Sequence, residues 1–110
     1  MTTRRGADQL LRDRIGIGPD VLLSVCQRWQ IAELALFGSV LRSDFGPQSD
    51  IDVLVSFAPD AAHSLFDLTR LQDELEALFG RPVDLVEKRS LRNPFRRQEI
   101  MATQQVVYAA

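Results

Sequence analysis

The stretch IAELALFGSVLRSDFGPQSDIDVLVSF, residues 31–57, decides the fold of this chain. It contains two apolar runs, Ile31–Phe37 and Ile51–Phe57, which are predicted to be buried strands because they are short and rich in strand formers. Residues 43–49 between them are dense in turn-forming residues and are predicted to be a loop. The centre of the chain is therefore a pair of strands joined by an ordered connection.

Helices are predicted on both sides of this strand pair. A short helix is expected over residues 7–15, and a second begins at Pro19, which suits a first helical position. The apolar face of the second helix is predicted to contain Val21, Leu22, Val25 and Trp29. Ser64 and Asp67 favour a capped helix start, and Gly80 supplies the stop after Phe79. The residues that repeat at helical spacing between them are Leu65, Leu68, Leu71, Leu75, Leu78 and Phe79.

The C-terminal third predicts two more strands and a helix. Residues 82–87 are predicted to be a strand, Asn93 and Pro94 favour a helix start, and residues 106–108 suit an edge strand. Strands alternating with helices indicate an α/β (α+β) domain with a small mixed sheet of three to four strands flanked by helices. The 110 residues suit a single domain, 1–110.

Composition narrows the class of protein. Thirteen Lys and Arg against fifteen Asp and Glu give a formal net charge of −2, so the sequence makes no strong case for nucleic-acid binding. Cys26 is the only cysteine, which excludes an internal disulfide and fits a reducing compartment. The first six residues contain no apolar segment of a signal peptide, and no apolar run is long enough to span a membrane. We therefore expect a cytoplasmic protein with no membrane partner.

Acidic residues mark a candidate metal site. Asp50 and Asp52 lie two residues apart at the start of a strand, so their side chains share one face. Adjacent carboxylates repel each other unless a cation or a proton separates them, and Mg²⁺ with oxygen ligands is the natural solution. Asp84 stands among strand formers and would join the pair if its strand neighbours Ile51–Phe57. Three carboxylates suit two-metal phosphoryl chemistry.

Gly38 and Ser39 supply the complementary half of the site. Glycine lets the backbone approach a phosphate closely, and the amides and hydroxyl that follow can donate to phosphate oxygens. If Ser39 begins a short helix, the helix terminus adds partial positive charge. Arg42 either donates to the same phosphates or forms a surface salt bridge.

These residues resemble a known family. Gly38-Ser39, followed after ten residues by Asp50-Ile51-Asp52, is similar to the signature of the DNA polymerase beta-type nucleotidyltransferase superfamily. Within this superfamily, the chain resembles the minimal nucleotidyltransferases, or MNT domains, often encoded beside HEPN toxins. The resemblance extends over about residues 34–107.

The resemblance implies a fold, an activity and roles for the site residues. It implies a polymerase beta-like fold in which Gly38 and Ser39 bind the triphosphate. Asp50 and Asp52 would hold Mg²⁺, and Asp84 would complete the site near the attacking hydroxyl. It further implies transfer of NMP from an NTP, with ATP as the expected donor. In MNT antitoxins the acceptor is a tyrosine of the HEPN partner, whose ribonuclease activity is silenced.

Alternative functions stay open at the level of sequence. The chain could be an antitoxin that neutralises its toxin by direct binding and does not need catalysis. Transfer to a small molecule such as an aminoglycoside is a further alternative, weakened because we expect no second domain to bind it. Base preference and assembly into a homo-oligomer are also undetermined. A basic cluster is predicted to be a solvated face or to contact an acidic partner or an RNA tail: Lys88, Arg89, Arg92, Arg96 and Arg97.

Overall fold

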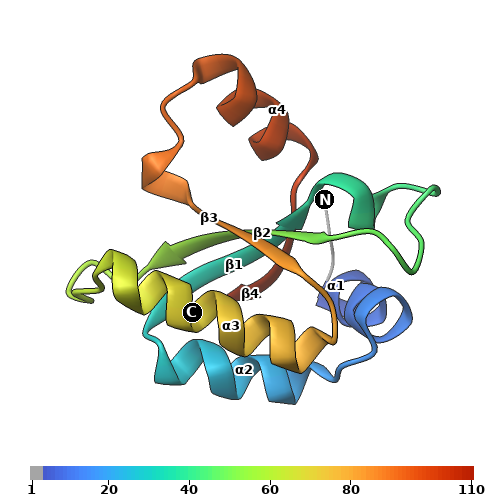
Figure 1. Ribbon diagram of the computed structural model, residues 1–110, viewed down its shortest axis with the longest axis horizontal. Helices are drawn as coiled ribbons and strands as arrows, with labels where there is room; N and C mark the ends of the chain where they lie inside the picture. The colour runs from blue at the N-terminus through green and yellow to red at the C-terminus, as the bar shows by residue number, and fades with distance from the viewer. Residues whose placement is uncertain (1–3) are drawn as a thin grey trace.

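A mixed sheet forms the centre of the molecule, with helices on both of its faces (Figure 1). The computed structural model describes the backbone of residues 4–110 and the side chains from residue 6 onward. Residues 1–3, part of the predicted polar start, lie outside the described residues. The helices and strands, in chain order, are α1 (Arg4–Leu10), α2 (Pro19–Arg28), β1 (Ile31–Phe37), β2 (Ile51–Phe57), α3 (Leu65–Phe79), β3 (Val83–Glu87), α4 (Pro94–Thr103) and β4 (Gln105–Ala109). Shorter helical turns follow three of them: Leu11–Ile15, Gly38–Leu41 and Lys88–Ser90.

The sheet has the strand order β3-β2-β1-β4. β1 pairs antiparallel with β2 and with β4, whereas β2 and β3 are parallel. Parallel neighbours need a crossover connection, and α3 provides it. This topology confirms the predicted mixed sheet, and β4 is an edge strand as expected. β3 forms the other edge, next to β2.

Side chains alternate between the two faces of the sheet along each strand, so the buried core is divided into one cluster on each face. On the face covered by α2 and α3, Leu36 and Val53 pack with Leu22 and Leu71 in the larger buried cluster. A smaller buried cluster lies on the opposite face beneath α4, and it consists of Ala35, Phe37, Leu54, Leu91 and Ile100. Asp52 lies two residues before Leu54, so its side chain is on the face of the smaller cluster.

The sequence predicts both ends of α3 and the starts of α2 and α4, whereas the first helix begins at Arg4 and gives way to a wider turn over Leu11–Ile15 within the predicted range 7–15. Ser64 caps α3, since its Oγ accepts a hydrogen bond from the backbone N–H of Asp67 while the Asp67 carboxylate accepts one from the Ser64 N–H. Gly80 ends α3 in the left-handed conformation. Asn93 caps α4. Within residues 4–110 no helix is long and apolar enough to cross a membrane.

Two apolar positions predicted to be on packed helix faces are instead exposed. Val21 is 41% exposed and Leu65 is 83% exposed. Successive helical residues are about 100° apart, so Val21 lies about 100° from the buried Leu22 and off its stripe. Leu65 precedes the buried Leu71 by six residues, which places it about 120° away around α3. The predicted apolar faces were therefore too wide.

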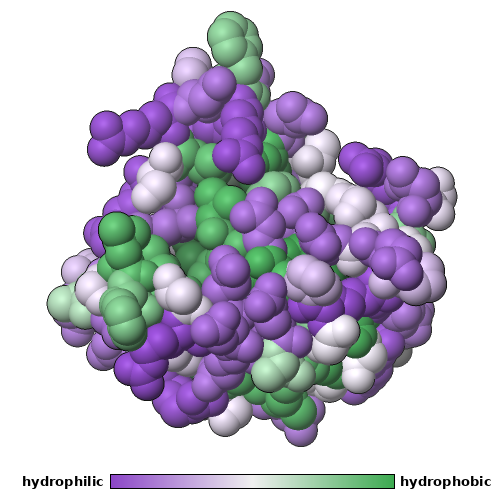
Figure 2. Space-filling model, in the orientation of Figure 1, coloured by the Kyte–Doolittle hydropathy of each residue, from purple (hydrophilic) through white to green (hydrophobic). Residues whose placement is uncertain are grey.

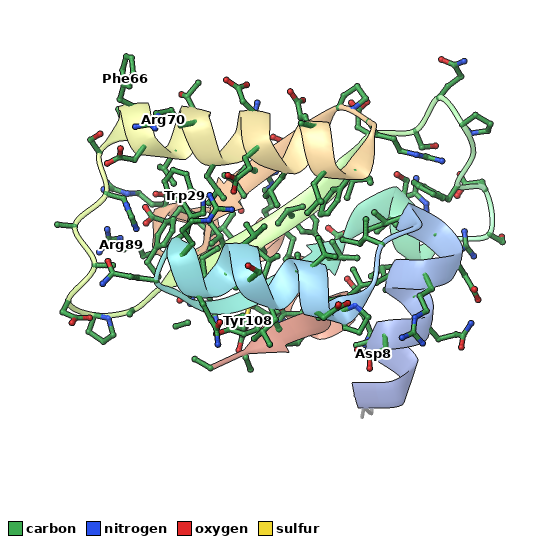
Figure 3. All side chains as sticks on the ribbon, turned by 90° about the horizontal axis from the view of Figure 1, so that it is seen from below. Asp8, Trp29, Phe66, Arg70, Arg89 and Tyr108 are labelled. Atoms are coloured by element: carbon green, nitrogen blue, oxygen red, sulfur yellow. The ribbon has the colours of Figure 1, made fainter. Side chains whose placement is uncertain are left out.

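A charged contact holds the end of α2 against α3. Trp29 lies between these two helices (Figure 3), and its Nε1 donates to Glu74 Oε2 at 2.9 Å. Arg28 Nη1 donates to the other oxygen of Glu74 at 2.6 Å. Burial raises the pKa of Glu74, but the hydrogen bonds from Arg28 and Trp29 lower it by more, so that the pKa lies below its ordinary value.

We expect Glu74→Gln to lower the free energy of unfolding at neutral pH, because the amide loses the charge that strengthens both hydrogen bonds. The folded-state pKa lies below the unfolded value of about 4.3, so the wild-type advantage is complete above that value and is lost as pH falls through the folded pKa. Urea unfolding of both proteins at a series of pH values measures this difference. Glu99→Gln, on the exposed side of α4, is the control. A difference for Glu74→Gln that does not change with pH would contradict the assignment.

Candidate active site

Gly38 ends β1 in a conformation that favours glycine. Its φ is +73°, in the left-handed region. A Cβ built at this position would collide with Oδ2 of Asp52 and lie 3.2 Å from its Cγ. The preceding residue, Phe37, is the register partner of Asp52 across β1 and β2. The absence of a side chain at Gly38 is therefore what allows the backbone to lie directly against the Asp52 carboxylate.

Ser39 lies in the short 3-10 turn Gly38–Leu41 that follows β1. Its hydroxyl donates to the backbone carbonyl oxygen of Asp50 at 3.3 Å. This bond joins the two ends of the connection between β1 and β2, so Ser39 and Asp50 stay next to each other although ten residues separate them. Ser39 is half-buried, which leaves its hydroxyl accessible to a ligand.

The structure brings the three predicted carboxylates to one region. Asp52 on β2 is the register partner of Asp84 on β3. Adjacent strands lie about 4.8 Å apart, and register partners point to the same face of a sheet. Asp50 directly precedes β2, two residues from Asp52. Asp52 is half-buried, whereas Asp50 and Asp84 are exposed, Asp84 on the edge strand.

Burial and neighbouring charge disfavour the ionised form of Asp52. The pKa of Asp52 is raised, first by burial of its side chain, then by the negative charge of Asp84, and then by that of Asp50. The positive charges of Arg96 and Arg42 act in the opposite direction and offset only part of this effect. A cation bound between the carboxylates would relieve the repulsion.

The donor set suits Mg²⁺ that binds together with phosphates. Within residues 4–110, no three His, Cys, Asp or Glu side chains are arranged to hold a metal ion by themselves. Mg²⁺ is usually bound by one or two carboxylates, with substrate phosphates and water completing its octahedral shell. The oxygen atoms of Asp50 and Asp52, with Asp84 beside them, meet this requirement.

Arg42 forms the surface salt bridge that the sequence leaves open as one alternative. Its Nε lies 3.1 Å from Asp44 Oδ1, and the two side chains are 63% and 70% exposed. An exposed pair of this kind contributes about 0–1 kcal/mol, so a phosphate can compete for the guanidinium at little cost. The charge of Arg42 acts on Asp52 from this position.

Arg81 organises the loop over residues 43–49, a role that sequence reasoning missed. Its Nη1 donates to the carbonyl oxygen of Gly46 at 2.8 Å and to that of Ser49 at 3.3 Å. The guanidinium also lies over the ring of Phe45, 4.3 Å from its centroid. Arg81 is more than thirty residues from these partners in the chain, so no local pattern points to the contact.

Arg96 is a second residue that sequence reasoning left outside the site. It lies four residues before Ile100 and therefore on the same side of α4. Ile100 packs in the cluster that contains Leu54, on the sheet face that bears Asp52. The spacing of Arg96 and Ile100 is a sequence signal that the two share one side of α4, but the position of that side relative to the carboxylates depends on how Ile100 packs.

His63 and Cys26 have structural roles. His63 lies in the loop before α3, where its Nε2 is hydrogen-bonded to the carbonyl oxygen of Trp29 at 2.8 Å and its ring contacts Trp29 and Phe57. Cys26 is fully buried in the larger core cluster. Burial raises the pKa of the Cys26 thiol to about 12, so the thiol is unreactive at neutral pH.

Comparison with known protein families identifies the family of this chain. The family model described as the nucleotidyltransferase domain matches residues 20–107. The chain belongs to the nucleotidyltransferase family. The matched region includes β1, β2 and β3 with the glycine-serine turn and all three aspartates.

Relatives of this nucleotidyltransferase are named as protein adenylyltransferases. Over 67 residues the chain is 40% identical to the protein adenylyltransferase MntA of Thermococcus cleftensis, an alignment that covers 61% of this chain and 66% of the relative. Over 73 residues it is 34% identical to a protein of Methanocaldococcus jannaschii assigned as a protein adenylyltransferase, with 66% and 73% covered.

Solved structures share the fold. A structure described as a minimal nucleotidyltransferase superposes with a TM-score of 0.67 at 34% identity, covering 88% of this chain and 92% of that chain. A toxin–antitoxin crystal structure with AMP-PNP superposes with a TM-score of 0.69 at 20% identity, covering 86% and 75%. At this lower identity the likeness shows the fold alone.

We expect Gly38→Ala to lower the free energy of unfolding by more than about 1 kcal/mol, because alanine disfavours a positive φ and its Cβ would displace the Asp52 carboxylate. Gly46→Ala is the matched control, since a Cβ there would meet nothing within 4 Å and its φ is not in the left-handed region. Thermal and urea unfolding compare the two variants. If Gly38→Ala is as stable as Gly46→Ala, the contact does not constrain the fold.

Proposed function

We propose that this nucleotidyltransferase is an Mg²⁺-dependent protein adenylyltransferase. It transfers AMP from ATP to a tyrosine hydroxyl of a HEPN-family toxin, and the modification makes the chain an antitoxin. The observation that carries the proposal is the register pairing of Asp52 with Asp84 directly beside the Gly38–Ser39 turn. This pairing brings together the two halves that nucleotidyl transfer needs, carboxylates for a metal ion and backbone and hydroxyl donors for phosphates.

Asp50, Asp52 and Asp84 are the residues that we assign to Mg²⁺, with two ions expected in the complete complex. Bound Mg²⁺ supplies positive charge that offsets the charge of the triphosphate and of the three carboxylates. The raised pKa of Asp52 supports this assignment, because the same burial and charges that disfavour an isolated carboxylate favour a bound cation.

Gly38, Ser39 and Arg42 are the residues that we assign to the triphosphate. The backbone at Gly38 is unobstructed by a side chain, and the Ser39 hydroxyl turns from the Asp50 carbonyl to a phosphate oxygen. Arg42 exchanges its exposed contact with Asp44 for the phosphates. These groups act by holding the nucleotide in place and by stabilising charge in the transition state.

The reaction forms one bond and breaks one bond at the α-phosphorus of ATP. The acceptor hydroxyl oxygen bonds to this phosphorus, and the bond from phosphorus to the oxygen that bridges to the β-phosphate breaks. AMP stays on the acceptor and pyrophosphate leaves. The hydroxyl proton passes to the Asp84 carboxylate, which suits this role because it is exposed at the edge of the sheet where an acceptor can approach.

The acceptor is a second protein in this proposal. Residues 4–110 form one sheet with its helices, and the carboxylates lie open on the α4 side. A fold neighbour supports the class of partner: a structure described as a tri-AMPylated HEPN toxin of Shewanella oneidensis in complex with an MNT antitoxin superposes with a TM-score of 0.61 at 19% identity.

We expect Asp50→Asn/Asp52→Asn to reduce AMP transfer at least about a thousandfold, because the charge stabilisation that a metal ion supplies amounts to several kcal/mol. Intact-mass spectrometry measures the AMP units added to a purified HEPN-family protein after incubation with this chain, ATP and Mg²⁺. The variant should fold at least as well as the wild type, because it removes two mutually repelling charges.

Asp60→Asn/Asp73→Asn is the matched control, since it removes two carboxylates at exposed positions away from the site. It should transfer AMP at the wild-type rate. A wild-type chain that binds the HEPN protein and silences its ribonuclease without adding mass would contradict the proposal. So would silencing that survives Asp50→Asn/Asp52→Asn, because either result indicates an antitoxin that acts by binding.

A further inference from the structure

Two arginines near the start of α4 lack a partner of their own. Of the five cationic side chains in residues 88–97, three make contacts inside the domain. Lys88 Nζ lies 3.7 Å from Glu33 Oε1, and Arg89 Nε lies 3.2 Å from Glu87 Oε2. Arg97 Nη1 donates a hydrogen bond to the carbonyl oxygen of Lys88 at 3.1 Å. The guanidinium groups of Arg92 and Arg96 make no hydrogen bond or ion pair with any residue of the described part. Both side chains are exposed.

Phe95 lies between these two arginines with its ring in solvent. It is 81% exposed. Burial of a Phe side chain stabilises a folded protein, and this position forgoes most of that gain. The space-filling view shows apolar surface at the tip formed by the start of α4, bordered by hydrophilic surface (Figure 2). An aromatic ring flanked by arginines is the composition that recurs at the centre of protein interfaces.

Asn93 caps α4, but the charges in the first turn do not favour the helix. Its first turn contains no acidic residue, although acidic side chains are favoured there by the helix dipole and arginines are not. Arg96 and an exposed Phe95 occupy this turn instead. Residue types that lower the stability of a helix are expected at positions used for binding.

The tip lies on the same side of the sheet as the three aspartates. α4 covers the face opposite α2 and α3 (Figure 1), where Ile100 packs against Leu54 in the smaller cluster. Arg96 lies one turn before Ile100, and its charge acts on Asp52. A polypeptide bound at the tip is therefore on the same side of the sheet as the exposed carboxylates.

We propose that Arg92, Phe95 and Arg96 form a docking surface, the α4 tip, for an acidic polypeptide segment that presents the acceptor hydroxyl to the site. The inference rests on the proposed function, because it names the chemistry by which the acceptor is recognised. Phe95 inserts into an apolar pocket of the acceptor, and the two arginines pair with carboxylates on either side of it.

The charges favour a polypeptide over a nucleic acid. Only two cations at the tip are free, within the described residues, whereas a nucleic-acid site typically neutralises about six to ten phosphates. Because the whole chain has a net charge of −2 and charges are screened beyond about 10 Å, recognition of an acidic segment depends on this local pair of arginines.

The test is a binding measurement with defined probes, in the absence of ATP and Mg²⁺. The probes are a fluorescent synthetic peptide with a tyrosine between leucine and glutamate residues, the same peptide with lysine at each glutamate position, and a single-stranded RNA oligonucleotide. Fluorescence anisotropy at low salt should show that the acidic peptide binds the full chain more tightly than the other two. Phe95→Ala/Arg92→Glu should weaken this binding at least about tenfold.

Phe66→Ala/Arg70→Glu is the matched control, because it changes an exposed Phe and an exposed Arg on α3 (Figure 3). It should bind the acidic peptide like the wild type. Both double variants should keep the wild-type melting temperature and the shift that ATP with Mg²⁺ produces, which shows that each is folded with an intact nucleotide site. Equal peptide affinity in the two double variants, or no binding of the acidic peptide to the wild type, would overturn the inference.

Three further outcomes decide the nature of the ligand and separate this inference from the proposed function. RNA that binds more tightly than the acidic peptide, and that depends on the α4 tip, would overturn the inference in favour of a nucleic-acid surface. Peptide binding that fails while AMP transfer to the HEPN protein persists would reject the docking surface and leave the proposed function standing. Peptide binding at the tip without AMP transfer would support the docking surface and count against the proposed function.

Discussion

The contact between the backbone of Gly38 and the carboxylate of Asp52 is the constraint on which the rest of the site depends. It exists because β1 and β2 are paired so that Phe37 lies opposite Asp52, and because the next residue has no side chain. The turn after β1 then carries Ser39 to the Asp50 carbonyl. One strand register thus sets the positions of both the Gly38–Leu41 turn and two of the three carboxylates.

This arrangement concentrates negative charge without a built-in counterion. Arg42 and Arg96 act on Asp52 but do not form ion pairs with it within the described residues. A buried sheet core lies beneath the site, and Arg81 fixes the connecting loop from the side. Carboxylates without an ion-pair partner favour the binding of a cation, but their mutual repulsion lowers the stability of the folded domain.

Much of this fold could be predicted from local sequence. The bounds of β1 and β2 follow from two apolar runs, and the ends of α3 follow from Ser64 and Gly80, because strand and cap signals act over a few residues. The placement of Asp84 beside Asp52 needed the strand order, which periodicity does not contain. The predicted site residues do lie together, while their roles remain predictions.

What the sequence could not supply were contacts between distant residues and the true width of helix faces. Arg81 reaches the loop over residues 43–49 across more than thirty positions, and only the folded sheet brings them together. Leu65 matches the apolar repeat of α3 yet lies exposed, since a repeat of leucines does not say which of them meet the sheet. Arg96 was assigned to a basic cluster on composition, whereas its place on α4 depends on how Ile100 packs.

Because β2 and β3 are parallel, the aspartates lie near the start of both strands, and the opposite ends of the two strands carry none of the predicted site residues. Both strands start beside the carboxylates and run toward the opposite end of the sheet, which is roughly 20 Å away at the end of the seven-residue β2. The exposed Pro59 and Asp60 leave β2 at that distant end. A reporter peptide or a fused module inserted there would be held away from nucleotide and acceptor alike. The fold thus tolerates enlargement at one end while the other stays fixed by its register.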